Sequence, residues 1–135
     1  MNFELQPRTR PGQVLVEMAE SMADDFATRA AAHDKEGSFA HENIERLRTT
    51  GYLAAAVPTE FGGLGVASVH DLLIAQSRLA RSDASTTIAA NMHLNVVSGM
   101  ARGYRRCIAN GQFSVAEKFA DALRAVASGE MVLAS

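Results

Sequence analysis

Four histidines and one cysteine are the side chains of this sequence that can take part in the widest range of chemistry. Cys107 stands alone, so neither an intramolecular disulfide nor a cysteine-based metal site can form within one chain, and a reducing cytoplasm is the expected location. Three histidines, His33, His41 and His70, are predicted at helix ends or on polar faces, and their placement predicts no metal site. His93 is the histidine that needs an explanation.

His93 belongs to a predicted helix that begins at Ala84 and continues to about Ala101, or as far as Ala109. Apart from this histidine, the side chains from Ala84 to Ala101 are small, apolar or neutral. A helix without a charged face is buried on most sides, and its polar groups then need hydrogen-bond partners. Two interpretations stay open: His93 is a core residue bonded to a backbone carbonyl, or it contacts a ligand.

The segment from Val57 to Gly65 reads V-P-T-E-F-G-G-L-G and must turn. Proline fixes φ and has no backbone N–H, while glycine permits positive φ, which we predict at Gly62 or Gly63. The segment has neither the Lys-Ser or Lys-Thr of a P-loop nor the G-x-G-x-x-G of a dinucleotide site. We therefore assign it a structural role, with Pro58, Glu60, Gly62, Gly63 and Gly65 as its turn residues.

The elements that position these residues are predicted from apolar spacing and capping residues as an all-α, up-and-down bundle of about five helices. Besides the helix of His93, the predicted helices run from Pro11 to about His33, from His41 to Thr49, from Ser68 to Arg81, and from Ser114 to Gly129. Ser68 with Asp71 and Ser114 with Glu117 resemble capping arrangements. Tyr52 to Val57 is predicted as a buried extended piece, and Met131 to Ser135 as the start of a strand.

Inward faces follow from helical spacing. In the third predicted helix the inward residues are Val69, Leu72, Leu73, Gln76, Leu79 and Ala80. In the last helix they are Val115, Phe119, Leu123 and Val126.

The composition limits the classes of function that the chain can have. The chain has 135 residues, 47% of them hydrophobic and 21% charged, with a net charge of -2, which describes one globular domain. The cluster Arg102, Arg105 and Arg106 is too small for a nucleic-acid face. No apolar run approaches the length of a membrane span, and the N-terminus has no signal-like apolar region.

Several motifs together resemble the N-terminal helical domain of the acyl-CoA dehydrogenase family. The turn is similar to the family's P-E-E-[FY]-G-G-x-G signature, with Thr59 in place of the commoner glutamate. Ile44-Glu45-Arg46-Leu47 precedes it, Asn91-Met92-His93-Leu94 follows at the expected place, and Ala127-Ser128-Gly129-Glu130 matches the lead into the middle domain. The resemblance implies an extension over 1–10, the helical domain over 11–128, and the first residues of a missing middle β domain over 129–135.

The resemblance implies the N-terminal part of a cytoplasmic FAD enzyme of fatty acid metabolism that desaturates an acyl-CoA between its α and β carbons. FAD and the catalytic base would be held mainly by absent domains, so this chain alone is expected to be inactive and to contain no catalytic residue. An electron-transfer acceptor and a homo-oligomer, dimer or tetramer, are implied as partners. A flavin-dependent monooxygenase of the same fold and a non-catalytic helical interaction module are the alternatives.

The same family geometry makes the His93 helix a wall of the substrate and flavin cavity, formed by Thr86, Thr87, Ala90, Asn91, His93 and Leu94. In the related monooxygenases a histidine at about this point can bond to substrate or to a flavin peroxide. We expect Thr87, Ala90 and Leu94 to be left uncovered in this chain. Ile88, Met92, Asn95, Val96 and Gly99 would then point toward other helices.

Overall fold

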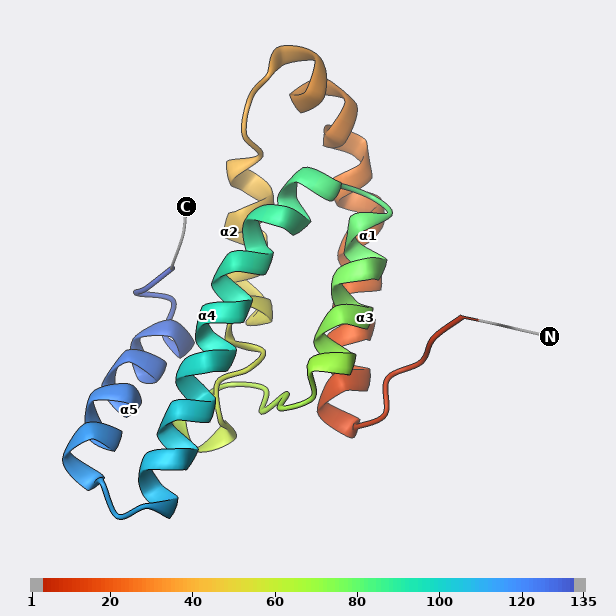
Figure 1. Ribbon diagram of the computed structural model, residues 1–135. Coiled ribbons are helices and arrows are strands. Elements are labelled where there is room, and N and C mark those ends of the chain that lie inside the picture. The colour runs from red at the N-terminus through yellow and green to blue at the C-terminus, as the bar shows by residue number, and fades with distance from the viewer. Residues whose placement is uncertain (1–3, 133–135) are drawn as a thin grey trace.

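The computed structural model describes residues 4–132, and within that range it contains helices and no strand. The α-helices are α1 (Arg10–Glu36), α2 (His41–Thr49), α3 (Val69–Ala80), α4 (Ala84–Ala109) and α5 (Phe113–Ala127). Two short 3-10 helices, η1 (Tyr52–Ala54) and η2 (Thr59–Phe61), lie between α2 and α3. Successive α-helices alternate in direction (Figure 1), which confirms the predicted up-and-down bundle.

The helix boundaries follow from capping residues. Thr9 caps α1 by accepting a hydrogen bond from the N–H of Gly12, and Asp83 caps α4 by accepting one from Thr86. Glycine ends α1: Gly37 has φ 66° and donates its N–H to the carbonyl of His33. The helix therefore ends at Glu36, beyond the predicted end near His33, because the polar residues before the glycine do not interrupt it.

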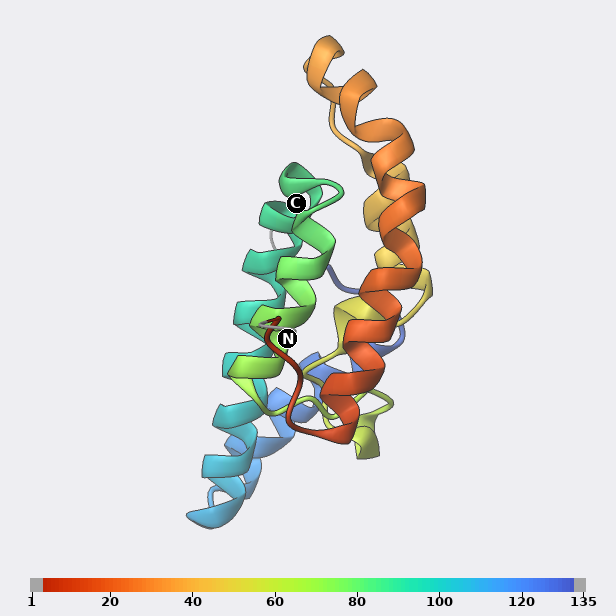
Figure 2. The same ribbon diagram turned by 90° about the vertical axis from the view of Figure 1, so that its right-hand side faces the viewer.

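α3 lies between α1 and α4, which pack on different sides of it (Figure 2). A helix packed on two sides buries more than one stripe, so Ile74, Ala75 and Arg78 are buried together with Leu72 and Leu79. The predicted inward face is therefore partly wrong, since Val69 and Leu73 are exposed.

Two apolar cores share the middle of the molecule. One core joins α1, α2 and α3 to Ala90 and Leu94 of α4, and the other joins α5 to Val97 and Ala101 of the same helix. The segment 52–57 also contributes to both cores. Each core is thus completed by α4.

The segment 52–57 is buried as predicted but is not extended. Gly51, with φ 89°, redirects the chain after α2. The N–H groups of Ala54, Ala55 and Val57 then bond to carbonyls three residues earlier, at 3.1 Å in each case. These local bonds satisfy the N–H groups, while the carbonyls of Ala54, Ala55 and Val57 accept from the N–H groups of Leu64, Val66 and Gly65.

The glycine-rich turn has the predicted left-handed backbone at Gly62, where φ is 94°, and also at Gly65, where φ is 73°. Gly63 is needed for a different reason, because a Cβ there would lie 2.1 Å from the carbonyl oxygen of Val57. The N–H of Gly65 bonds to that same oxygen at 2.9 Å. Glycine therefore serves both close backbone approach and positive φ.

Two predictions at the C-terminal end are wrong or lie beyond the described residues. α5 begins at Phe113 without a side-chain cap, and Glu117 bonds Arg124 at 3.1 Å instead of capping the helix with Ser114. Val115 is exposed, while Leu123 and Val126 are buried as predicted and Phe119 is half-buried. Met131 and Val132 belong to no strand, and 133–135 lie outside the described residues.

Candidate functional site

An apolar hollow of about 310 Å³ lies against α4. Its lining residues come from the α1–α2 connection, α2, η1, α4 and the C-terminal segment, and they are Phe39, His41, Ile44, Leu53, Ala89, Ala90, His93 and Val132. The volume is at the lower end of the range for small-molecule sites, which is about 300–1,000 Å³. Ala90 and His93, two of the predicted site residues, meet here.

His93 makes the backbone-carbonyl bond of the core interpretation and also borders the hollow, so its contact with a ligand stays a prediction. The side chain is buried, and its Nε2 lies 2.8 Å from the carbonyl oxygen of Leu53. The geometry fits an Nε2–H that donates to this carbonyl, because a backbone oxygen can only accept. The bond fixes the plane of the imidazole ring on a helix face that borders the hollow.

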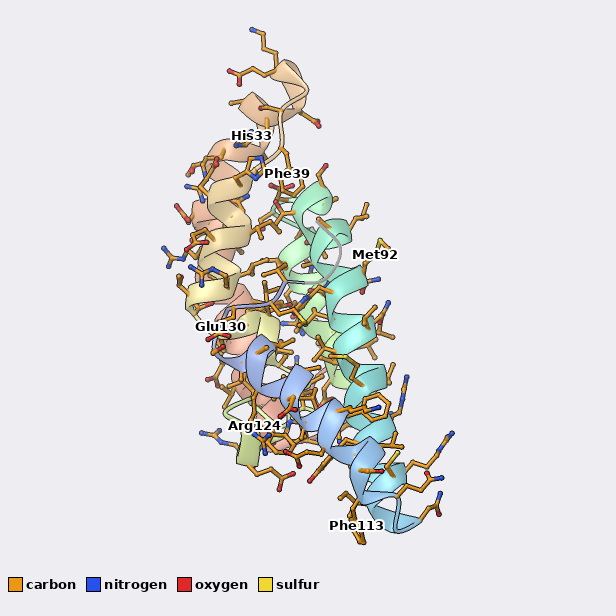
Figure 3. All side chains as sticks on the ribbon, turned by 90° about the vertical axis from the view of Figure 1, so that its left-hand side faces the viewer. His33, Phe39, Met92, Phe113, Arg124 and Glu130 are labelled. Atoms are coloured by element: carbon orange, nitrogen blue, oxygen red, sulfur yellow. The ribbon has the colours of Figure 1, made fainter. Side chains whose placement is uncertain are left out.

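The predicted orientation of α4 is reversed in the structure. Ile88, Met92 and Val96 are 70%, 61% and 46% exposed, whereas Thr87, Ala90 and Leu94 are no more than 7% exposed. Met92 accordingly projects away from the bundle (Figure 3). The small uncharged face lies inward because it packs against α3, α2 and η1, where close helix approach favours small side chains.

The six predicted cavity residues do not converge on one space. Asn91 and Leu94 line a second hollow of about 240 Å³, between α3 and α4. Thr87 is buried in the bundle, where its carbonyl accepts a hydrogen bond from Gln76 at 3.2 Å. Thr86 belongs to a polar cluster at the start of α4. Of the six predicted residues, only Ala90 and His93 border the apolar hollow.

The polar cluster centres on Asn43, a residue that sequence reasoning missed. Its side chain is fully buried and donates to Asp83 at 3.0 Å and to Thr86 at 3.1 Å. Its oxygen accepts from the Arg29 guanidinium at 2.6 Å, and Arg29 also binds Asp25. The cluster joins α1, α2 and α4 beside the hollow. Asn43 follows Glu42 on a short helix, and nothing in that pattern signals a buried amide.

Asp71 is the second residue whose role the sequence did not reveal. Besides its predicted place near the Ser68 cap, its buried carboxylate accepts from the N–H of Arg8 at 2.9 Å and binds Thr9 and His70. The nearby Arg78 donates to the carbonyl of Leu5 at 2.6 Å. Both residues hold the segment that precedes α1 and lie away from the hollow.

Comparison with known proteins matches residues 12–104 to a family described as acyl-CoA dehydrogenase, N-terminal domain. The chain belongs to this family. The fold and the resemblance predicted from the sequence are confirmed.

Curated relatives of this acyl-CoA dehydrogenase N-terminal domain differ in the reactions for which they are named. YdbM of Bacillus subtilis, named as a putative acyl-CoA dehydrogenase, is 43% identical over 61% of this chain and 21% of its own length. L-evernosamine nitrososynthase of a Micromonospora species is 33% identical over 86% of this chain and 31% of its own length. The chain spans less than a third of either relative.

Solved structures share the fold. A nitrososynthase of Micromonospora carbonacea var. africana superimposes with a TM-score of 0.84 at 31% identity, over 93% of this chain and 33% of that one. KijD3, in a structure with FMN and a dTDP-linked amino keto sugar, gives a TM-score of 0.80 at 30% identity, over 93% of this chain and 30% of that one. The family thus includes flavin-binding oxidoreductases with different small-molecule substrates.

The lining of the hollow bears on whether it could hold a flavin. Ala89 and Ala90 offer a small apolar surface to a ring or an alkyl group, but among the described residues no lysine or arginine lines the hollow to hold a flavin phosphate. Within 4–132 no group of histidine, cysteine and acidic residues could hold a metal ion. In the same range no helix is long and apolar enough to cross a bilayer.

Proposed function

We propose that the hollow beside His93 receives the apolar part of a small-molecule substrate in a flavin-dependent oxidoreductase, with this chain as one wall of the site. The observation that carries the proposal is the joint placement of Ala89, Ala90 and His93 on the uncharged part of α4, facing an apolar space. A bound flavin would supply the redox chemistry. The chain's own residues bind the substrate, orient it and exclude water.

A monooxygenase reaction is the better supported of two candidates. The nitrososynthase relatives align over 86% to 95% of this chain, whereas YdbM aligns over 61% of it. The polar side chains that line the hollow are the imidazoles of His41 and His93, with no carboxylate among them. In this candidate the imidazoles that line the hollow would orient a polar atom of the substrate.

Acyl-CoA desaturation is the second candidate, favoured by the 43% identity to YdbM. In this reaction the hollow would take the acyl chain, and a base from outside the described residues would remove the α proton. An electron-transfer acceptor would then reoxidise the flavin. FAD or FMN, a cytoplasmic location, and a dimer or tetramer are parts of the proposal shared by both candidates.

One pair of assays on the complete gene product separates the candidates. A dehydrogenase bleaches the absorbance of its oxidised flavin when an acyl-CoA is added without oxygen. A monooxygenase instead needs reduced flavin and oxygen to convert its substrate, for which an amino sugar nucleotide is a suitable first probe. If neither assay detects turnover across both substrate classes, the proposed function is contradicted.

His93→Gln tests the role of the imidazole, because glutamine retains a donor but loses the ring geometry. We expect at least a tenfold loss of kcat with the fold retained, a smaller effect than the roughly 10²–10⁴-fold that a side chain positioned for proton transfer contributes. His70→Gln is the matched control, since His70 contacts Asp71 outside the hollow. Equal activity of both variants would return His93 to a purely structural role.

A further inference from the structure

Phe39 lines two hollows that lie at the same end of the bundle. One is the apolar hollow of about 310 Å³ beside His93, and the other is a hollow of about 480 Å³ between the end of α1 and the α3–α4 turn. Among the described residues, Phe39 alone borders both spaces. Phe39 therefore lies where the two hollows approach each other.

The ring of Phe39 makes an edge-on aromatic contact and lies partly at the surface. Phe39 lies in the short connection between α1 and α2, and its ring meets that of His41 edge-on at 4.9 Å. The side chain is 43% exposed, so its removal leaves no cavity in the main cores. Figure 3 places Phe39 close to the end of the molecule that carries His33, opposite the end marked by Phe113.

The second hollow offers room beyond the ring of Phe39. Five of its lining residues are alanines from four parts of the chain, namely Ala30, Ala31, Ala40, Ala80 and Ala84. Polar and charged side chains border it as well, including His33, Asp34, Arg81 and Asp83. A substrate that passed the ring of Phe39 would meet small side chains rather than a closed wall.

We propose that Phe39 is a specificity-determining residue that closes one end of the His93 hollow and thereby limits the length of the substrate. The inference rests on the proposal that this hollow receives the apolar part of a substrate. With the ring present, each methylene added to the alkyl chain of the substrate strengthens binding until that alkyl chain reaches Phe39. Replacement of the ring by a methyl group joins the two hollows and moves that limit to longer chains.

Binding of straight-chain 1-alkanols tests the inference without any catalytic step. Affinities from butanol to dodecanol are measured by NMR on the chain, with the methyl groups of Ala89 and Ala90 as reporters of the hollow. In the unchanged protein the affinity should rise about fourfold with each buried methylene and then level off. In Phe39→Ala the rise should continue through at least two further methylenes, which amounts to about a tenfold gain or more for the longest probes.

Phe39→Leu and Phe113→Ala are the comparison variants. Leucine should give an intermediate limit, while Phe113, exposed at the other end of the bundle, should leave the limit unchanged. An unaltered limit in Phe39→Ala, with normal thermal unfolding, would overturn the role of Phe39. Absence of any shift at Ala89 and Ala90 with every alkanol would overturn it too.

The outcome is separable from the proposed function. A shifted length limit supports the wall between the hollows even if the flavin assays detect no turnover. Turnover with an unchanged length limit in Phe39→Ala keeps the proposed function and removes only the role of Phe39.

Discussion

Thr9 and Asp71 are joined by two hydrogen bonds across 62 positions of the sequence: the hydroxyl of Thr9 donates to Oδ2 at 2.6 Å and its backbone N–H donates to the same oxygen at 2.9 Å. Burial alone would raise the pKa of Asp71. The bonds from Thr9, Arg8 and His70 outweigh burial, so the pKa lies well below its usual range. The start of α1 is thereby fastened to α3.

Asp71→Asn should remove a pH-dependent contribution to stability. Because the folded-state pKa is depressed, the contribution is present above the unfolded pKa of about 3.9 and is lost as the pH falls toward the folded value. We expect the variant to be less stable by about 2 kcal/mol at pH 7, with a smaller difference at pH 3. Urea unfolding at several pH values measures this. The exposed Asp121→Asn is the control, and an equal loss at pH 7 and pH 3 would contradict the prediction.

Gly63→Ala should destabilise the chain by about 3 kcal/mol or more, because a Cβ there lies 2.1 Å from the Val57 carbonyl oxygen and the backbone must shift. Gly99→Ala is the matched control. Gly99 lies inside α4, and a Cβ at this position would meet no neighbouring atom within 4 Å, so alanine should stabilise by about 0.5–1 kcal/mol. Thermal unfolding compares the two. Equal melting temperatures would show that the turn relaxes without cost.

Asn43→Leu should cost about 2–4 kcal/mol, because Arg29, Asp83 and Thr86 each lose one hydrogen bond to Asn43 while leucine fills a similar volume. The variant keeps the side chain large, so a loss of stability reports the hydrogen bonds rather than a cavity. Asn95→Leu, on an exposed position of α4, is the control. Chemical denaturation measures the free energy of unfolding of both variants. If Asn43→Leu leaves it unchanged, the polar cluster makes no net contribution to stability.

Ala89→Leu should weaken alkanol binding about tenfold, because the larger side chain occupies part of the hollow. Ala89 is half-buried and tolerates growth better than the buried Ala90, where phenylalanine would overpack the core. The NMR titration used for Phe39 measures the effect. Ile88→Leu, on the outward face, should bind as the unchanged protein does; a parallel loss there would point to a general change in the helix.

The 135-residue chain should bind FAD or FMN no more tightly than about a micromolar dissociation constant, some 8 kcal/mol. The reason is the absence of lysine and arginine from the lining of the hollow, which leaves the flavin phosphates without a charged partner. A fluorescence titration of each flavin measures this. Saturable binding well below a micromolar would mean that a cofactor site lies elsewhere on the chain.

Local features were the most predictable part of the fold. α2 has the predicted bounds, Ser68 acts as a predicted cap, and Gly62 has the predicted positive φ. Each of these depends on neighbours within a few residues of the chain. Ser114 shows the limit of such reasoning, because its capping pattern competes with a helix that begins one residue earlier.

The orientation of α4 could not be predicted from its sequence. Helical spacing groups Thr87 with Ala90 and Leu94, but it does not say which group faces the protein. The family resemblance implied the wrong face, and hydrophobicity did not correct it because the exposed Ile88, Met92 and Val96 are as apolar as core residues. The partners of Asn43 and Asp71 were equally hidden, because they come from segments distant in sequence. Of the six predicted cavity residues, Ala90 and His93 line the hollow, and their contact with a ligand stays a prediction.

α4 completes both apolar cores, which has a consequence for how the chain loses its structure. Neither apolar core can open fully while α4 keeps its contacts, and neither core stays folded once α4 has unfolded. Amide protons in the middle of α4 and in the segment 52–57 should therefore exchange only through global unfolding, at the same free energy in both places. A disturbance at the far end of α5 would then be felt at the His93 hollow as a change in the population of the folded state rather than as a local displacement.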